Sequence, residues 1–243
     1  MPVSTLSAAL LEEARESSTS APRGSAANRI YAGLRARILS LDLKPNAKVS
    51  RNEVAEAYGV SQAPVRDALQ KLAHDGLVIS YPQSRTVVSR IDLEHARETQ
   101  FLRRSVEIEV ARALARNAAA EALVPAGRIL RMQRLAGEDK DIGEFTALDG
   151  LFHLSLFEAA GVARLYHIVA ARGGHIDRLR RLNLPDPGKL TEVVQQHEQI
   201  LRAIRNRDEA AAEGAVRAHL SGTLAASEEI RRKFPDYFGG QLP

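Results

Sequence analysis

Residues 60–72 read VSQAPVRDALQKL, and this stretch decides the fold of the region around it. Its apolar residues recur at helical spacing, so that Val65 and Leu69 share one face of a predicted helix. Ser61 is a typical N-cap residue, and the helix is therefore expected to start there. Pro64 lies three residues later, where the backbone N–H of a helix has no internal partner and its loss is tolerated. The stretch thus predicts a helix with a polar, accessible first turn.

The flanking sequence predicts a small domain around this helix. Upstream, one helix is expected from about residue 28, and a second follows the capping box Ser50–Glu53. Downstream, two β-rich runs at 77–81 and 86–90 are separated by a short polar stretch, which indicates a hairpin. The order helix, helix, turn, helix, hairpin is typical of a winged helix-turn-helix.

Basic charge is concentrated in the same region. Residues 23–92 carry eleven Lys and Arg against six Asp and Glu, whereas residues 93–243 carry twenty-two against twenty-one. A basic small domain suggests a polyanion as its partner, although charge alone leaves a solvated basic surface equally open. Combined with the winged pattern and the polar helix tip, the charge predicts DNA binding.

The predicted recognition helix presents side chains that can contact bases. In a helix-turn-helix the first residues of this helix enter the major groove. Here they are Ser61, Gln62 and Ala63, with Arg66 about one turn further. Gln can pair with adenine, Arg can pair with guanine, and Ala can pack on a thymine methyl group. These four residues are therefore predicted to contact DNA.

The composition excludes several classes of protein. The 243 residues include no Cys, which excludes disulfides, thiolate metal sites and a Cys nucleophile. No run of about 18 apolar residues is present, so no membrane-spanning segment is expected. The N-terminus lacks the basic start of a signal peptide. We therefore expect a cytoplasmic protein with no membrane partner.

The remainder of the chain is expected to be helical. From Asp92 to Phe234, Ala, Leu, Arg and Glu follow helical periodicity with short separators, which favours antiparallel neighbours in a bundle. The six expected helices lie roughly at residues 93–116, 120–137, 142–160, 163–183, 190–206 and 209–233. The predicted fold class is mostly α, with an N-terminal winged helix-turn-helix followed by an all-helical antiparallel bundle. The expected divisions are a mobile N-terminal arm at 1–27, the winged domain at 28–91, the helical domain at 92–234 and a tail at 235–243.

Four polar residues in the predicted bundle form a candidate metal site. In LDGLFHLSLF (148–157), Asp149 and His153 are four residues apart and share a helix face in an apolar segment. His197 and His219 lie near the middle of the fifth and sixth predicted helices. Three neutral imidazoles and one carboxylate suit a divalent cation such as Zn²⁺, and such sites form between facing helices of bundles. Spacing alone leaves open an intrahelical Asp–His pair with two surface histidines.

The stretch VSQAPVRDALQKLAHDGLV (60–78) resembles the signature of the GntR family, in which a Val-Ser-Arg-x-Pro-Val-Arg-x-Ala-Leu-x-x-Leu run leads to a Gly-Leu-Val strand. The resemblance covers residues 28–90 and implies a DNA-binding domain. The residues that it assigns to the major groove or its phosphates are Arg51, Gln62 and Arg66, and Asn52 is a further predicted DNA contact. Arg85 in the wing is implied to reach the minor groove or a phosphate. Relatives usually carry Arg at the position of Gln62 and Gly at that of Arg85, which leaves the operator sequence open.

The helical region resembles the FCD ligand-binding domain that follows the winged helix in FadR-like members of this family. The family pattern is Asp-x-x-x-His, a later His, and another His about twenty residues on. The matching residues are Asp149, His153, His197 and His219. The resemblance implies that they hold a divalent metal, most readily Zn²⁺ and alternatively Ni²⁺, Mn²⁺ or Fe²⁺, and that the carboxylate of a small organic acid completes the coordination. Six helices rather than seven favour the VanR-like branch.

A second part of the same resemblance concerns FLRRSVEIEVARALA (101–115), which matches the family's Arg-x-x-x-Glu helix with Arg103 and Glu107. Arg103 is thereby implied to bind an effector carboxylate, since a guanidinium can donate two parallel hydrogen bonds to it. An ordinary i,i+4 surface ion pair is the alternative. His175, in RGGHIDRL, is a further candidate for effector binding.

These features predict a homodimeric, ligand-responsive transcriptional regulator, with repression as the expected sign. It would bind a palindromic operator in double-stranded DNA, one protomer per half-site, and a small carboxylate effector would shift its operator affinity. The protein is not expected to be an enzyme. The main alternative is a metalloenzyme acting on a small hydroxy or keto acid, with an appended DNA-binding domain and a general base such as Glu107, Glu158 or Glu198. A helical scaffold without metal or ligand is the third possibility.

Overall fold

The computed structural model describes residues 25–81, 85–185 and 188–239. The chain divides into two compact units, one formed by Met1–Ile91 with Asp236–Pro243 and the other by Asp92–Pro235. In the described part of the chain, no helix has the length and apolar character needed to traverse a bilayer.

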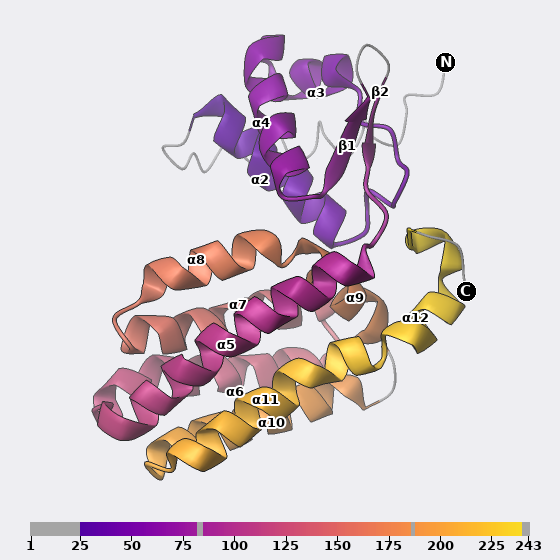
Figure 1. The fold of residues 1–243 in the computed structure, drawn as a ribbon. Coiled ribbons are helices and arrows are strands. Elements are labelled where there is room, and N and C mark those ends of the chain that lie inside the picture. The colour runs from indigo at the N-terminus through magenta and orange to yellow at the C-terminus, as the bar shows by residue number, and fades with distance from the viewer. Residues whose placement is uncertain (1–24, 82–84, 186–187, 240–243) are drawn as a thin grey trace. The chain divides into compact units, whose positions relative to one another are not determined.

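The first unit is a winged helix-turn-helix (Figure 1). Its elements are α2 (Ala26–Leu39), α3 (Arg51–Tyr58), α4 (Gln62–His74), β1 (Val78–Tyr81) and β2 (Arg85–Val88). The two strands pair antiparallel, with Val78 opposite Val88. The core gathers the apolar faces of the three helices and includes Ile30, Leu34, Val54, Val65, Leu69 and Leu72. The predicted order of elements is confirmed.

Capping groups set the ends of the two helices that form the turn. Ser50 caps α3, because its Oγ accepts a hydrogen bond from the backbone N–H of Glu53 at 3.3 Å. Gly59 follows α3 with a φ of 61°, a left-handed conformation that glycine adopts without strain. Ser61 occupies the N-cap position of α4, yet its side chain makes no cap hydrogen bond. One reason is that Pro64, the third residue of α4, offers no backbone N–H for such a bond.

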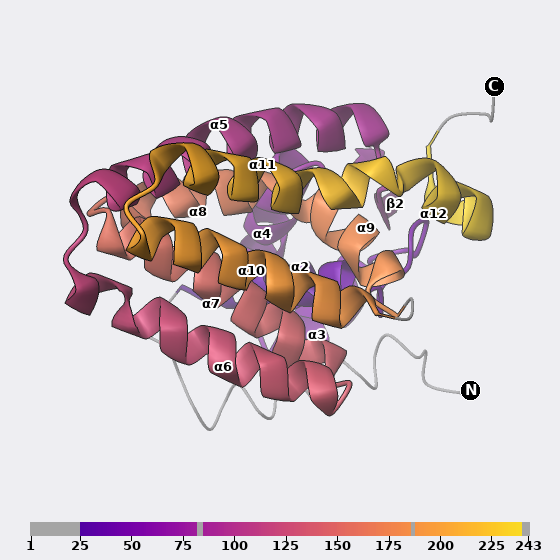
Figure 2. The same ribbon diagram turned by 90° about the horizontal axis from the view of Figure 1, so that it is seen from below.

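The second unit is an all-helical bundle (Figure 2). Its elements are α5 (Leu93–Asn117), the 3-10 turn η1 (Ala120–Leu123), α6 (Val124–Glu138), α7 (Ile142–Ala159), α8 (Ala163–Arg172), α9 (Gly174–Asn183), α10 (Lys189–Arg205), α11 (Glu209–Ala225) and α12 (Ser227–Lys233). Helix α10 lies between α6 and α11, and α11 packs against α5. Helices α5 and α11 run antiparallel, because Arg116 near the end of α5 bonds Glu209 at the start of α11. The core between the helices includes Leu114, Leu130, Phe145, Phe152, Ile200 and Val216.

Two helices that the sequence predicts as continuous are divided. The segment 163–183 is split into α8 and α9 at Gly173, which is followed by a second glycine, and glycine is a poor helix former. The segment 209–233 is split at Ala226, where the hydroxyl of Ser227 donates to the backbone oxygen three residues earlier at 2.7 Å. The expectation of continuous helices is wrong for these two segments, so the helix count no longer favours the VanR-like branch.

Two observations concern the predicted N-terminal arm and the predicted C-terminal tail. Residues 1–24, most of the predicted arm, lie outside the described residues, and α2 begins at Ala26. In the predicted tail, the backbone oxygen of Tyr237 accepts from the N–H of Ile91 at 2.7 Å, and the N–H of Gly239 donates to the oxygen of Ile91 at 3.1 Å. The C-terminal segment thereby joins the first unit through backbone pairing.

Candidate functional sites

The four predicted metal ligands come together inside the bundle. Asp149 and His153 lie one turn apart on α7, whereas His197 lies on α10 and His219 on α11. Each residue offers one ligand atom, and the four atoms lie within 4.8 Å of one another. The three histidines are buried and Asp149 is half-buried. His197 and His219 are therefore buried beside Asp149 and His153, and the alternative in which they are surface histidines is wrong.

The spacing of these ligand atoms fits a single metal ion. Nε2 of His219 lies 3.2 Å from Nε2 of His153 and 3.3 Å from Nε2 of His197. Nε2 of His197 lies 3.5 Å from Oδ1 of Asp149. With metal–ligand bonds of about 2.0–2.1 Å, tetrahedral geometry separates neighbouring ligand atoms by about 3.3–3.4 Å. These three separations are close to that value, and the four residues, whose ligand atoms all lie within 4.8 Å of one another, can hold an ion of the size of Zn²⁺ once the wider pairs adjust.

A hydrogen-bond acceptor on the far side of each imidazole determines where its proton sits. The Nδ1 contacts are His153 with Glu107 Oε2 at 2.8 Å, His197 with Gln133 Oε1 at 2.8 Å, and His219 with Gln196 Oε1 at 3.0 Å. Because these oxygens only accept, each contact favours a proton on Nδ1, and a neutral ring in that tautomer keeps the lone pair of Nε2 free. The three lone pairs converge on one point, which is the arrangement that a bound cation stabilises.

Burial makes the imidazoles suitable ligands. It lowers the pKa of His197 to about 3, because the nearby Asp149 only partly offsets the loss of solvation. Burial also lowers the pKa of His219 well below its ordinary value, and the neighbouring imidazoles add to this effect. Burial opposes ionisation of Asp149, but the charge of Arg180, bonded at 3.1 Å, brings the pKa of the carboxyl below its usual range. Near neutral pH the group therefore includes the neutral imidazoles of His197 and His219 together with the carboxylate of Asp149.

Arg103 and Glu107 form a buried pair on α5 rather than a surface ion pair. Their side chains are 12 % and 7 % exposed, and Nε of Arg103 donates to Oε1 of Glu107. The other oxygen of Glu107 accepts from Nδ1 of His153, so one carboxylate joins Arg103 to a predicted metal ligand. Burial alone would raise the pKa of Glu107, but the charge of Arg103 and the hydrogen bonds from Arg103 and His153 outweigh it and lower the pKa to about 2. Glu107 is thus an ionised bridge.

A small cavity adjoins this site. Its polar lining comprises Gln100, Arg103, Arg180 and Thr223, and Ile176 and Leu220 add apolar surface. Its volume of about 10 Å³ is roughly the space of one water molecule. The side chain of Gln100 donates to the backbone oxygen of Leu220, which ties α5 to α11 beside the cavity. An organic acid can enter only if these side chains move.

His175 lies in another polar group, at the start of α9. Its Nδ1 accepts a hydrogen bond from the backbone N–H of Asp92 at 2.9 Å and lies 3.0 Å from Nη2 of Arg178. Its ring packs against that of His95, with 4.7 Å between the ring centroids. These contacts connect α9 to the first turn of α5. The role of His175 in effector binding stays a prediction.

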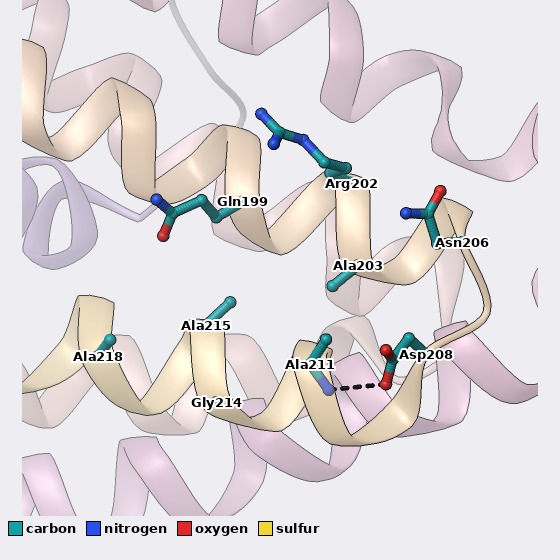
Figure 3. A pocket seen from close by; sticks show the side chains of 9 residues that line it. All are labelled: Gln199, Arg202, Ala203, Asn206, Asp208, Ala211, Gly214, Ala215 and Ala218. Carbon is teal, nitrogen blue, oxygen red and sulfur yellow. Dashed lines mark hydrogen bonds between the residues drawn. The ribbon is translucent and has the colours of Figure 1, made fainter.

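An open groove of about 350 Å³ lies between α10 and α11 (Figure 3). One wall carries Gln199, Arg202 and Asn206, and the other consists mainly of Ala211, Gly214, Ala215 and Ala218. Asp208, at one end, uses its carboxylate to cap α11 by accepting from the N–H of Ala211 at 2.9 Å. The groove lining contains none of the predicted metal, effector or DNA-binding residues. Of the two hollows, the small cavity is the one lined by a residue predicted to bind the effector, Arg103.

The predicted DNA-binding residues are exposed on the first unit. They are Arg51, Asn52, Ser61, Gln62, Ala63, Arg66 and Arg85. The side-chain amide of Gln62 donates to Oδ1 of Asn52, so the starts of α3 and α4 lie side by side. The side chain of Arg66 is 72 % exposed, and its Nε lies 3.9 Å from Asp67. Arg85 begins β2, with its guanidinium 5.3 Å from the centre of the Tyr81 ring.

Comparison with known proteins assigns the family. The profile of the FCD domain matches residues 98–222, and that of the bacterial regulatory proteins of the gntR family matches residues 26–88. The chain belongs to the GntR family and carries an FCD domain. An uncharacterized HTH-type transcriptional regulator of Streptomyces ambofaciens, in an unstable DNA locus, is 37 % identical over 209 residues, 86 % of this chain and 88 % of that protein. The HTH-type transcriptional repressor RspR of Escherichia coli K12 is 30 % identical over 210 residues, 86 % of this chain and 92 % of that protein.

Solved structures of GntR regulators share the fold. Escherichia coli McbR/YncC superposes with a TM-score of 0.71 at 18 % identity, covering 87 % of this chain and 99 % of that one. A putative GntR regulator from Rhodococcus sp. RHA1 gives 0.69 at 20 % identity, with 85 % and 98 % covered. At these identities the likeness concerns the fold alone. Together with the family profiles it confirms that this GntR protein is a DNA-binding transcriptional regulator with a helical FCD domain.

Three residues that contact the predicted metal ligands of this FCD domain were not predicted: Gln133, Arg180 and Gln196. A signal for Gln133 does exist, because it lies on the buried stripe of α6 with Leu130, where an apolar residue is expected. Gln196 and Arg180 have no such signal, since amides and arginines are common on exposed helix faces. Only the approach of α9 to α7 shows that Arg180 binds Asp149.

Proposed function

We propose that the protein is a homodimeric, cytoplasmic repressor whose FCD domain binds a divalent metal, with Zn²⁺ favoured, and a small organic acid. Its winged domain binds a palindromic operator, one protomer per half-site, through the exposed residues of α3, α4 and the wing. The acid binds beside the metal and shifts the equilibrium between states of different operator affinity. The repressive sign follows the Escherichia coli relative, which is described as a repressor.

The observation that carries the metal and effector proposal is the convergence of three Nε2 atoms and one carboxylate beside two arginines. Within this buried group, the positive charges of Arg103 and Arg180 are matched by the negative charges of Glu107 and Asp149. A divalent ion adds two further positive charges, of which the nearby carboxylate of Asp177 offsets one at most. Burying them is costly unless an anion also binds, and a carboxylate can both ligate the metal and bond a guanidinium.

The metalloenzyme alternative receives less support from the geometry. A hydrolytic or proton-transfer site needs a general base that is free to take a proton from bound water. Glu107 is held by Arg103 and His153, and its lowered pKa of about 2 makes it a weak base. Glu198 pairs with Arg134, and the remaining candidate, Glu158, is exposed.

Thermal unfolding of the full chain with a panel of small organic acids, with and without a metal chelator, tests the proposal. A ligand that binds the native state raises the melting temperature, and at 100 times its Kd it adds about 2.7 kcal/mol of stability. We expect at least one acid to raise the melting temperature and the shift to vanish with chelator. A panel that gives no shift in the metal-loaded protein contradicts the proposal.

A matched pair of variants on α5 makes this experiment specific. Arg103→Ala removes a guanidinium that lines the cavity, whereas Arg97→Ala removes an exposed one on the same helix. The acid-induced shift should be lost in Arg103→Ala and kept in Arg97→Ala. Equal shifts in both variants would show that the acid binds elsewhere.

A further inference from the structure

A fully buried glutamine stands directly behind one metal ligand. Gln133 lies on α6 with no exposed surface, in a stripe whose other members include Ala126, Leu130 and Ala136. Its Oε1 lies 2.8 Å from Nδ1 of His197 on α10. This contact between side chains of α6 and α10 restrains both residues. It is made to Nδ1 of His197, whose other ring nitrogen, Nε2, faces the proposed metal site.

The burial of Gln133 has a cost that packing does not explain. Its side-chain nitrogen Nε2 is buried and finds no hydrogen-bond partner among the described residues. A buried donor that has lost water without gaining a partner destabilises the fold. Methionine or leucine would fill similar space without this cost. The benefit of the amide must therefore lie in its other atom, the oxygen that accepts from His197.

That oxygen determines which nitrogen of His197 carries the proton. Nε2 of His197 lies 3.5 Å from the carboxylate oxygen Oδ1 of Asp149, which attracts a proton to Nε2. A proton on Nε2 would remove the lone pair that a metal needs. Phe152 stacks on the ring at 4.0 Å between centroids, which hinders its rotation. The acceptor supplied by Gln133 therefore favours the tautomer with the proton on Nδ1 and a free Nε2.

We propose that Gln133 is a positioning residue that holds His197 in its metal-binding tautomer. The proposal rests on the metal site proposed above. Gln196 makes the corresponding contact to His219, but its amide nitrogen also donates to Glu192 at 2.9 Å, so it has a second role along α10. Gln133 lacks this second bond among the described residues, which makes it the cleaner residue to test.

The test compares Gln133→Met, Gln133→Glu and the control Gln195→Met, an exposed glutamine on α10. Zn²⁺ affinity is measured by competition with a chromogenic chelator, and the tautomer of His197 in metal-free protein by ¹⁵N NMR of the imidazoles. We expect Gln133→Met to lower Zn²⁺ affinity by about 10–100-fold and to move the His197 proton to Nε2. Gln133→Glu keeps the acceptor and should keep the Nδ1 proton and the wild-type affinity or a higher one.

The outcomes separate this inference from the metal site itself. Wild-type affinity and an Nδ1 proton in Gln133→Met would overturn the positioning role and leave the site standing. A second outcome would also overturn the inference. If Gln133→Met and Gln133→Glu both lose Zn²⁺ affinity and neither changes the tautomer of His197, Gln133 has a packing role. If wild-type protein binds no Zn²⁺, the proposed site fails, and the inference fails with it.

Discussion

The two units use their polar side chains in opposite ways. On the winged unit, Arg51, Ser61 and Arg66 are exposed at or near helix starts. In the helical unit, Glu107, Asp149 and the three histidines are buried or half-buried, and each bonds another side chain. The first set is predicted to find its main partners when DNA binds, whereas the second set is organised by the fold before any ligand arrives.

This difference predicts how substitutions behave in each unit. Exposed groups that contact a partner should affect binding and leave stability nearly unchanged. Buried groups that bond each other should affect metal affinity and stability together, because removing one leaves another without a partner. Each prediction below either sharpens this contrast or breaks it.

The largest effect is expected from removing two of the proposed metal ligands. In a His197→Ala/His219→Ala variant, two of the four converging ligand atoms are lost, and retained Zn²⁺ should fall from about one per protomer to near zero. Metal analysis after dialysis measures this directly. His167→Ala, which removes an exposed histidine of α8, is the control and should keep its metal. Unchanged metal in the double variant would refute the site.

The next largest effect concerns pH and the stability of metal-free protein. The folded pKa of His197, about 3, lies below its ordinary value of 6.5, so between these pH values the unfolded chain binds a proton that the folded chain does not. The free energy of unfolding therefore keeps its full value above pH 6.5. It falls as the pH drops towards 3, with a loss of roughly 2–3 kcal/mol at pH 4.5. Chemical denaturation at pH 7 and pH 4.5 measures it.

The matched control for this pH effect is His197→Gln, which has no titrating group at this position. Its stability should fall less between pH 7 and pH 4.5 than that of the wild type, by about the same 2–3 kcal/mol. Equal pH dependence in the two proteins would show that His197 is not held neutral by burial.

On the winged unit, Arg66→Ala should weaken operator binding by about 1–3 kcal/mol while the melting temperature stays within about 2 °C of wild type. The reason is that its side chain is 72 % exposed and makes one long contact, with Asp67. Fluorescence anisotropy with labelled operator measures the change, and Gln70→Ala, exposed further along α4, should bind as wild type. A large loss of stability in Arg66→Ala would break the contrast between the units.

The smallest effect compares the two serine caps. Ser50→Ala should cost about 1 kcal/mol of stability, because Ser50 accepts from the N–H of Glu53. Ser61→Ala should cost close to nothing, because Ser61 makes no cap bond at the start of α4. Operator affinity should show the reverse order if the Ser61 hydroxyl contacts DNA. Urea denaturation of both variants measures the loss of stability, and an equal loss in the two variants would contradict this prediction.

The sequence predicts the winged unit well because its signals are local. The capping box at Ser50–Glu53 and the apolar spacing in 60–72 act over a few residues, and each element forms where it is expected. The Asp149–His153 part of the candidate metal site was also recognisable, because the two residues lie one helical turn apart in an apolar segment. Only the Asp149–His153 spacing lies within one helix, and joining it to His197 and His219 on other helices required the resemblance to the FCD pattern.

What the sequence does not predict depends on contacts between helices. Arg180 and Asp149 are 31 residues apart, and Gln133 and His197 are 64 residues apart. Their pairing depends on how α9 meets α7 and how α6 meets α10, which residue spacing does not encode. The division of the helix predicted at 163–183 was missed for a different reason, since the strong periodicity on either side of Gly173 hides a weak position.

X-ray absorption spectroscopy of zinc-loaded protein tests the central claim most directly. The account predicts one Zn²⁺ per protomer with three imidazole nitrogens and carboxylate oxygen in its first coordination shell, at about 2.0–2.1 Å. Addition of an effector acid should change the oxygen ligands and leave the three imidazoles in place. A protein that retains no zinc, or a spectrum with fewer than three imidazoles, would contradict the account.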